Sequence, residues 1–242
     1  MNNMEEYRNL IDEGLSKYNT GEYLASIEFY DKAIELDPNE AVAYNRRGLA
    51  KHALKRYWES ILDYGKAIDL DPKYLGYYEN RGVARLDGKD YHAAICDFNE
   101  ILAKKPADYR MYTNRGVAFY YLGDYSKAAL DFQLALDIKP DAPIIYNNRG
   151  LLKEALGDPE GELNDYNHAI SLAPDYVDAL NNRGIARREQ GDYLGALEDL
   201  NKAISLDSSD AERYYERSLV KKALGDVDGA KADESIFKSM LA

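Results

Sequence analysis

Apolar and polar positions along the chain follow the spacing of amphipathic helices. The pattern is clearest in residues 110–138, where apolar side chains recur every three to four residues: Tyr112, Val117, Phe119, Ala128, Phe132 and Ala135. This spacing predicts one helix over about 110–122 and a second over about 126–138. Gly123 is suited to a left-handed cap between them, and Pro140 ends the second helix.

The same pattern returns every 34 residues along nearly the whole chain. One column of the repeat holds glycine in six successive copies: Gly14, Gly48, Gly82, Gly116, Gly150 and Gly184. A fixed period of this length indicates a stacked repeat architecture, in which each unit buries its apolar face against its neighbours. We therefore predict one elongated all-α domain over 1–242. Its seven repeats are 7–40, 41–74, 75–108, 109–142, 143–176, 177–210 and 211–242, the last a degenerate C-terminal cap.

Composition narrows the classes of partner. The chain has 31 basic and 43 acidic residues, a net charge of −12. This charge argues against nucleic acid or an anionic membrane surface as the main partner. A single cysteine, Cys96, excludes an intrachain disulfide framework. No signal peptide and no apolar run long enough to span a bilayer is evident, so we expect a cytoplasmic protein.

The repeat resembles that of the tetratricopeptide repeat (TPR) family. The resemblance covers residues 7–240 and rests on the glycine column, the closing prolines and three further columns. These columns hold the aromatics Tyr44, Tyr78, Tyr112, Tyr146 and Tyr214, the small residues Ala94, Ala128, Ala196 and Ala230, and the aromatics Tyr30, Tyr64, Phe98, Phe132 and Tyr166. The family implies a right-handed α-α superhelix of antiparallel helix hairpins. Its first helices line a concave groove that binds peptides or proteins.

Several repeats depart from the family pattern. Lys55 and Lys89 stand where a capping glycine is expected. In the fifth repeat Pro159 replaces an aromatic residue and Glu162 replaces a small one, so we expect a looser or reoriented joint near 158–163.

Arginine and aspartate occupy two slots in which the family usually has aliphatic and aromatic residues. The pairs are Arg47/Asp63, Arg81/Asp97, Arg115/Asp131, Arg149/Asp165, Arg183/Asp199 and Arg217/Asp233, while the first repeat has neither charge. Because the two charges are present or absent together, we predict an ion pair within each hairpin. Pairing with the next repeat, or a ladder of arginines free to bind a ligand, is the alternative.

The slots that face the groove in the family hold the candidate binding residues. They are Asn45, Arg46, Asn80, Asn114, Asn147, Asn148, Asn181 and Asn182, joined by Val117 in an aliphatic stripe and by Tyr120 as an aromatic anchor. A primary amide donates to one peptide carbonyl and accepts from one peptide N–H, so a row of them suits an extended main chain. The alternative is that these asparagines make local polar contacts only.

Exposed apolar residues define a second candidate surface. Trp58 and Leu62 lie one turn apart at slots that are usually polar, Leu130 shares the slot of Leu62, and Phe237 and Met240 have no later helix to cover them. Self-association through these residues is the alternative function, since such patches often mark interfaces.

No catalytic, cofactor-binding or metal-binding motif is present. The three histidines, His52, His92 and His168, fall in different slots, and no phosphate-binding glycine loop or cysteine motif occurs. We therefore expect no enzyme activity, no metal and no cofactor. The predicted function is a protein-interaction scaffold, with a structural homo-oligomer as the alternative.

Overall fold

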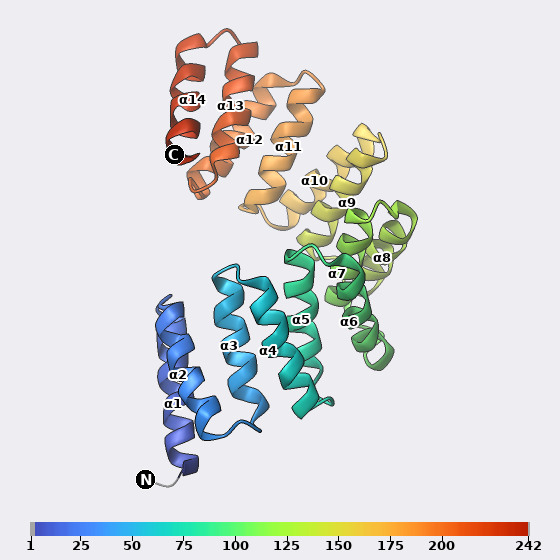
Figure 1. Cartoon of the computed structure of the whole chain (residues 1–242). Coiled ribbons are helices and arrows are strands. Elements are labelled where there is room, and N and C mark those ends of the chain that lie inside the picture. The colour runs from blue at the N-terminus through green and yellow to red at the C-terminus, as the bar shows by residue number, and fades with distance from the viewer. Residues whose placement is uncertain (1–2, 242) are drawn as a thin grey trace. The chain divides into compact units, whose positions relative to one another are not determined.

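The structure is a computed structural model that describes residues 3–241, and every regular element in that range is an α-helix (Figure 1). The helices are α1 Asn3–Asn19, α2 Tyr23–Leu36, α3 Ala41–Ala53, α4 Tyr57–Leu70, α5 Leu75–Asp87, α6 Tyr91–Lys104, α7 Tyr109–Tyr121, α8 Tyr125–Ile138, α9 Pro143–Ala155, α10 Pro159–Leu172, α11 Val177–Glu189, α12 Tyr193–Leu206, α13 Ala211–Ala223 and α14 Val227–Leu241. Two helices per repeat account for seven repeats. The helices predicted over 110–122 and 126–138 are α7 and α8, displaced by no more than one residue at either end.

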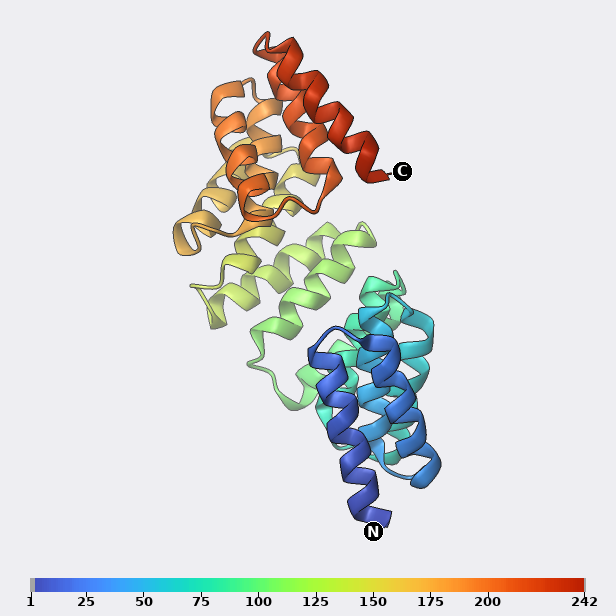
Figure 2. The same cartoon turned by 90° about the vertical axis from the view of Figure 1, so that its left-hand side faces the viewer.

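Contacts between helices divide the chain into two compact units, Met1–Asp124 with α1 to α7 and Tyr125–Ala242 with α8 to α14. In each unit a helix packs against the next one along the chain, and the first helices of neighbouring repeats also touch: α1 with α3, α3 with α5, α5 with α7, α9 with α11 and α11 with α13. The antiparallel course of the two helices in a repeat is clear for α1 and α2, in blue in Figure 2. The predicted all-α fold of helix hairpins is confirmed.

The glycine column exists because an aromatic ring occupies the space of its side chain. A Cβ atom at Gly48 would lie 2.7 Å from Cε1 of Tyr64, and one at Gly82 would lie 2.7 Å from Cε1 of Phe98. Tyr64 and Phe98 are themselves buried. The glycine on one helix and the large side chain on the other, a ring here and Leu200 opposite Gly184, therefore pack closely within the hairpin.

The turn between the two helices of a repeat contains a residue with positive φ, which is lysine in the second and third repeats and glycine in others. Gly123 and Gly191 have φ of 76° and 82° at the turn between the two helices. Lys55 and Lys89 occupy the same place with φ of 58° and 65°, as their sequence position predicts. A left-handed backbone is unfavourable for a residue with a Cβ atom, so these two turns carry conformational strain.

The fifth repeat keeps regular helices in spite of its two substitutions. Pro159 lies in the first turn of α10, where its missing N–H leaves no hydrogen bond unmade, and the Asp158 side chain caps the helix through the N–H of Gly161. Glu162 is buried, at 5% exposure. The helices α9 and α10 have the same lengths as their counterparts, 13 and 14 residues, so the expected irregularity does not extend to the helices themselves.

Candidate functional site

Neighbouring first helices bring the asparagines of adjacent repeats into contact. In the first unit Nδ2 of Asn80 on α5 donates to Oδ1 of Asn45 on α3 at 2.8 Å. In the second unit Nδ2 of Asn182 on α11 donates to Oδ1 of Asn147 on α9 at 3.0 Å. The same amide pair thus forms once in each unit, between residues 35 positions apart.

Pairing leaves each amide couple with hydrogen-bonding capacity. A primary amide has two N–H donors and a carbonyl acceptor, so one shared hydrogen bond leaves the Nδ2 group of Asn45 and the Oδ1 atom of Asn80 for other partners. Asn182 keeps the equivalent acceptor at a half-buried position, whereas Asn147 is buried at 5% exposure. The asparagines thus make the local polar contacts that the alternative interpretation expects.

The remaining candidate residues on the first helices are half-buried. Arg46, Asn114, Asn148 and Val117 each retain partial access to solvent. Within the part of the chain that the structure describes, Oδ1 of Asn181 is buried and accepts no hydrogen bond. An unsatisfied buried acceptor lowers stability, and this oxygen has no accessible surface through which a ligand could reach it.

The aromatic candidate Tyr120 belongs to a small cluster at the end of α7. Tyr120 and Tyr121 meet edge to face with ring centroids 5.3 Å apart, and Tyr121 stacks on Tyr91 of α6 at 5.1 Å. Tyr120 is half-buried, whereas Tyr121 is exposed. The aromatic surface at this end of α7 therefore includes Tyr121, which is more accessible than Tyr120.

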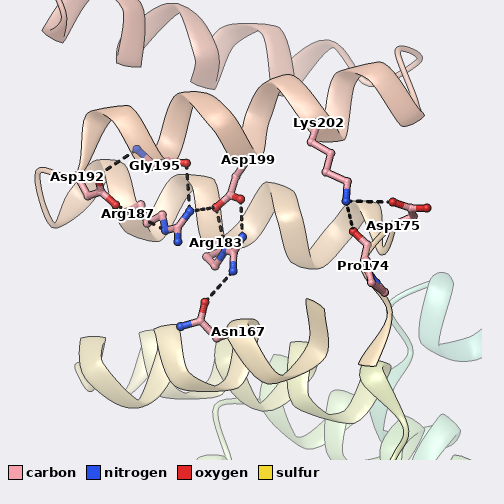
Figure 3. A network of polar contacts seen from close by, with 9 residues as sticks. All are labelled: Asn167, Pro174, Asp175, Arg183, Arg187, Asp192, Gly195, Asp199 and Lys202. Atoms are coloured by element: carbon pink, nitrogen blue, oxygen red, sulfur yellow. Dashed lines mark hydrogen bonds and ion pairs between the residues drawn. The ribbon is translucent and has the colours of Figure 1, made fainter. Parts of the chain in front are cut away.

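The arginine and aspartate columns form ion pairs inside the hairpins, as predicted. Arg183 donates from Nε and Nη2 to the two carboxylate oxygens of Asp199 at 2.8 and 2.6 Å (Figure 3). The same two-point contact joins four other pairs: Arg47 with Asp63, Arg81 with Asp97, Arg149 with Asp165, and Arg217 with Asp233. A bidentate contact between a guanidinium and a carboxylate is stronger than an ion pair with a single hydrogen bond.

A second basic residue stands four positions after five of the six arginines, the exception being Phe119 after Arg115, and its role in the network was missed at the level of sequence. Arg187 donates from Nη1 to Asp199 at 2.8 Å and to the carbonyl oxygen of Gly195 at 3.2 Å (Figure 3). Equivalent residues reach the aspartate of their own repeat: Lys51, Arg85, Lys153 and Lys221. The signal was visible as a basic column, since positions four apart on a helix share a face.

These contacts keep the buried charges ionised. Burial alone would raise the pKa of Asp233, but hydrogen bonds from Arg217 and Lys221 hold that pKa below its ordinary value. Hydrogen bonds to Asp165 raise the pKa of Arg149 in the same way. The arginines therefore act mainly as internal ties between helices, which favours the structural interpretation over a free ligand-binding ladder.

The exposed apolar residues predicted from sequence are accessible. Trp58 and Leu62 on α4 are 70% and 55% exposed, and Leu130 on α8 is 59% exposed. At the C-terminal end Phe237 folds back onto Tyr215, with ring centroids 5.2 Å apart, while Met240 stays exposed. Phe237 is thus covered within its own repeat, and Trp58 is the largest exposed apolar side chain of the first unit.

Metal-ligating side chains do not converge. Among residues 3–241, no group of three or more His, Cys, Asp and Glu side chains has the arrangement of a metal site. His52 instead contacts Asp87 at 2.8 Å, and the ring of His168 packs on Tyr146. None of the described helices combines the length and apolar character needed to cross a membrane.

Comparisons with solved structures agree with this architecture. The chain is similar to a tetratricopeptide repeat protein from Parabacteroides merdae, with 20% identity, a TM-score of 0.79, and coverage of 98% of this chain and 93% of that one. The APC/C hetero-tetramer Cut9–Hcn1 matches with 17% identity and a TM-score of 0.74, over 95% of this chain and 48% of that one. A thermophilic TPR protein from Thermus thermophilus matches with 20% identity and a TM-score of 0.61, over 74% of this chain and 98% of that one. At these identities the likeness shows the fold alone.

Family profiles identify the repeats by sequence, although no curated protein matches the chain. The profile described as TPR repeat matches residues 14–55, 116–157 and 184–225, more than half of the chain. Profiles described as tetratricopeptide repeat match residues 41–74, 144–176 and 165–198. The fold, the packing of the hairpins and these matches lead to one conclusion: the chain belongs to the tetratricopeptide repeat family.

Proposed function

We propose that the chain is a non-catalytic scaffold that binds a peptide segment or a partner protein on the first-helix face of its units, the face that carries the asparagines and the aliphatic residues. The observation that carries the proposal is the set of amide groups that internal contacts do not consume. The side-chain amides of Asn114 and Asn148 make no hydrogen bond to any residue that the structure describes. The half-buried amides of Asn45, Asn80 and Asn182 each keep a donor or an acceptor that their mutual pairing does not use, whereas Asn147 is buried.

The chemistry of this face suits an extended main chain. Free amides pair with peptide N–H and C=O groups whatever the side chains of the ligand are. The half-buried aliphatic residues beside them, Val83 and Val117 among them, supply apolar contacts for alternate side chains. The fold supports the general role of a protein-interaction scaffold, and the partner is a protein or peptide rather than nucleic acid, because the chain carries a net charge of −12.

A pull-down from the source organism with the doubly substituted variant Asn114→Ala, Asn148→Ala tests the proposal. Because these amides make no internal hydrogen bond, the variant should fold normally and lose the partners that the parent protein captures. The matched control carries Glu100→Ala and Lys231→Ala, two exposed positions on second helices, and should keep them. Recovery of the same partners by the asparagine variant contradicts the proposal.

A structural homo-oligomer is the second candidate, supported by the exposure of Trp58, Leu62 and Leu130. Sedimentation velocity at several concentrations distinguishes it, since self-association raises the mass with concentration. A variant with Trp58→Lys and Leu62→Glu should then remain a monomer. An unchanged mass for the parent protein across the concentration range removes this candidate.

A further inference from the structure

Gly65 lies in the interior of α4, where a glycine weakens the helix. Packing explains the glycines of the first helices, because Gly48 and Gly82 face rings that leave no room for a side chain. It does not explain Gly65. A Cβ atom at Gly65 would have a single neighbour within 4 Å, Nη1 of Arg81 at 3.8 Å, which is ordinary contact. The helix thus has room for a side chain that the sequence does not supply.

Other repeats show what that side chain does. The residue 16 positions before the arginine accepts a hydrogen bond from its Nη1 atom in four repeats: Asp31 from Arg47, Asn99 from Arg115, Asn167 from Arg183 and Asn201 from Arg217, at 2.6 to 2.8 Å. Gly65 holds this position before Arg81. In residues 3–241, Nε and Nη2 of Arg81 bond to Asp97, and Nη1 has no acceptor.

The missing side chain leaves an open surface cavity of about 400 Å³. Its walls include Trp58, Leu62 and Gly65 from α4 and Arg81 and Arg85 from α5. Trp58 and Leu62 are the exposed apolar residues described above, so an apolar wall stands beside an uncommitted guanidinium N–H group. This combination suits a ligand with one acceptor oxygen and one apolar side chain.

The positive charge that favours a carboxylate is local to the two arginines, because Lys66 and these arginines together balance Asp69, Asp90 and Asp97. Asp97 is shared between Arg81 and Arg85 at 2.7 Å each, so these three side chains carry one net positive charge, and Nε of Arg85 is buried without an acceptor. Lys66 adds a positive charge on the rim, where Asp69 and Asp90 are the acidic residues. Asp90 already caps α6 through the N–H of Ala93. One repeat earlier, the chain itself places a carboxylate on the equivalent atom, because Oδ1 of Asp31 lies 2.6 Å from Nη1 of Arg47.

We propose that the cavity over Gly65 binds an acidic side chain of a partner peptide, with a neighbouring aliphatic or aromatic residue of that peptide packed on Trp58 and Leu62. The partner's carboxylate takes the place that Asp31 occupies at Arg47, and it accepts a charge-assisted hydrogen bond from Nη1 of Arg81. This site lies between α4 and α5, involves none of the asparagines of the first-helix face, and does not depend on the function proposed for them.

Trp58 is the only tryptophan of the chain, so its fluorescence reports directly on the cavity. The probes are two capped peptides, acetyl-Leu-Glu-Leu-amide and acetyl-Leu-Gln-Leu-amide. The glutamate peptide should change the fluorescence in a saturable way, and the glutamine peptide should bind at least tenfold more weakly, equivalent to about 1.4 kcal/mol. Equal affinities for the two peptides, or no binding of either, overturn the proposal.

Two substitutions at Gly65 separate the carboxylate contact from general disturbance of α4. Gly65→Asn supplies the acceptor that other repeats have, so it should abolish binding of the glutamate peptide. Gly65→Ala adds only a Cβ atom and leaves Nη1 of Arg81 uncommitted, so binding should stay within about threefold of the parent protein. Circular dichroism confirms that both variants fold. Retained binding by Gly65→Asn overturns the proposal, as does self-association in sedimentation that the variant Trp58→Lys, Leu62→Glu abolishes.

Discussion

The polar networks of the third and sixth repeats are nearly the same in geometry and differ in two contacts. Nε of Arg187 lies 3.7 Å from Asp192, whereas Nε of Arg85 has no acceptor among the described residues, and a second difference lies in the link to the preceding repeat. Arg81, Arg85 and Asp97 match Arg183, Arg187 and Asp199, and in both cases the second arginine also reaches a main-chain carbonyl oxygen at 3.2 Å. In the sixth repeat Asn167 adds a hydrogen bond to the first arginine (Figure 3). In the third repeat Gly65 adds none. The comparison shows that the ion pair within a hairpin forms without the hydrogen bond from the arginine to the preceding repeat. The residue that accepts this hydrogen bond can therefore differ between repeats.

The largest effect should come from removing the shared aspartate. Asp97→Ala and Asp199→Ala each strand two largely buried arginines, and each should lower the free energy of unfolding by about 3–5 kcal/mol. Denaturant unfolding monitored by circular dichroism measures both. Replacing Arg183, Arg187 and Asp199 together by Met, Leu and Leu should cost less than Asp199→Ala alone. The control Asp175→Ala breaks only the exposed contact with Lys202 and should cost at most about 0.5 kcal/mol.

Exchanging the residue that distinguishes the two repeats should change stability in opposite directions. Asn167→Gly removes the acceptor of Arg183 and weakens α10, so it should lower the free energy of unfolding by about 1.5 kcal/mol. Gly65→Asn should raise it by about 1 kcal/mol for the same reasons. The denaturation midpoints of the two variants, compared with that of the parent protein, measure both changes in stability. A loss of stability in both variants would show that the space over Gly65 does not accommodate an asparagine.

The turns of the two repeats also differ, since Lys89 occupies the left-handed position that Gly191 occupies in the sixth repeat. Lys89→Gly, and Lys55→Gly in the second repeat, should each raise the free energy of unfolding by about 1 kcal/mol, because glycine adopts positive φ without steric cost. Gly191→Lys should lower it by a similar amount. Lys105→Gly is the control, because Lys105 has φ of −133° and should gain nothing. A gain at Lys105 equal to that at Lys89 would contradict the role of backbone strain.

The third and sixth repeats share a small residue, Ala94 or Ala196, at the column where the fifth repeat has Glu162. Burial, with the nearby charges of Glu154 and Glu189, raises the pKa of Glu162 to about 7. A raised pKa in the folded state means that the protonated form is favoured there. The contribution of Glu162 to the free energy of unfolding is therefore fully present below about pH 4.5 and is lost as the pH rises through 7.

Replacing Glu162 by alanine should remove this dependence on pH. Glu162→Ala should raise the free energy of unfolding by about 1 kcal/mol at pH 8 and by less at pH 5. Denaturation at the two pH values measures the difference between variant and parent. Glu100→Ala, an exposed substitution, should show no such difference. An equal gain for Glu162→Ala at both pH values would mean that shape rather than charge limits stability at this position.

Local sequence predicted most of the fold. The 34-residue period, the glycine and proline columns and the three-to-four spacing placed α7 and α8 to within one residue, because hydrophobic spacing and helix caps are local properties. The Arg183–Asp199 pair was also predictable, since both charges appear and disappear together. Its second base, Arg187, was not recognised, although four-residue spacing put it on the same helix face.

The candidate site was harder to predict because it depends on contacts between repeats. Sequence placed Asn45 and Asn80 in adjacent slots of successive repeats, but only the packing of α3 against α5 shows that their amides meet. Whether those asparagines and Tyr120 bind a partner stays a prediction, and so does the single-domain organisation of the chain. The geometry shows which side-chain hydrogen bond Asn45 and Asn80 already make, which the sequence does not.

By itself the sequence determined the repeat, the helices, the family and the charges that pair within a hairpin. Each of these depends on spacing along one or two helices. Tertiary structure alone decided which polar atoms remain without a partner. Gly65 looks ordinary in the sequence, and its meaning comes from Arg81 on the next helix, whose Nη1 atom lies above it without an acceptor. A missing contact of this kind has no local signal, because it belongs to two repeats at once.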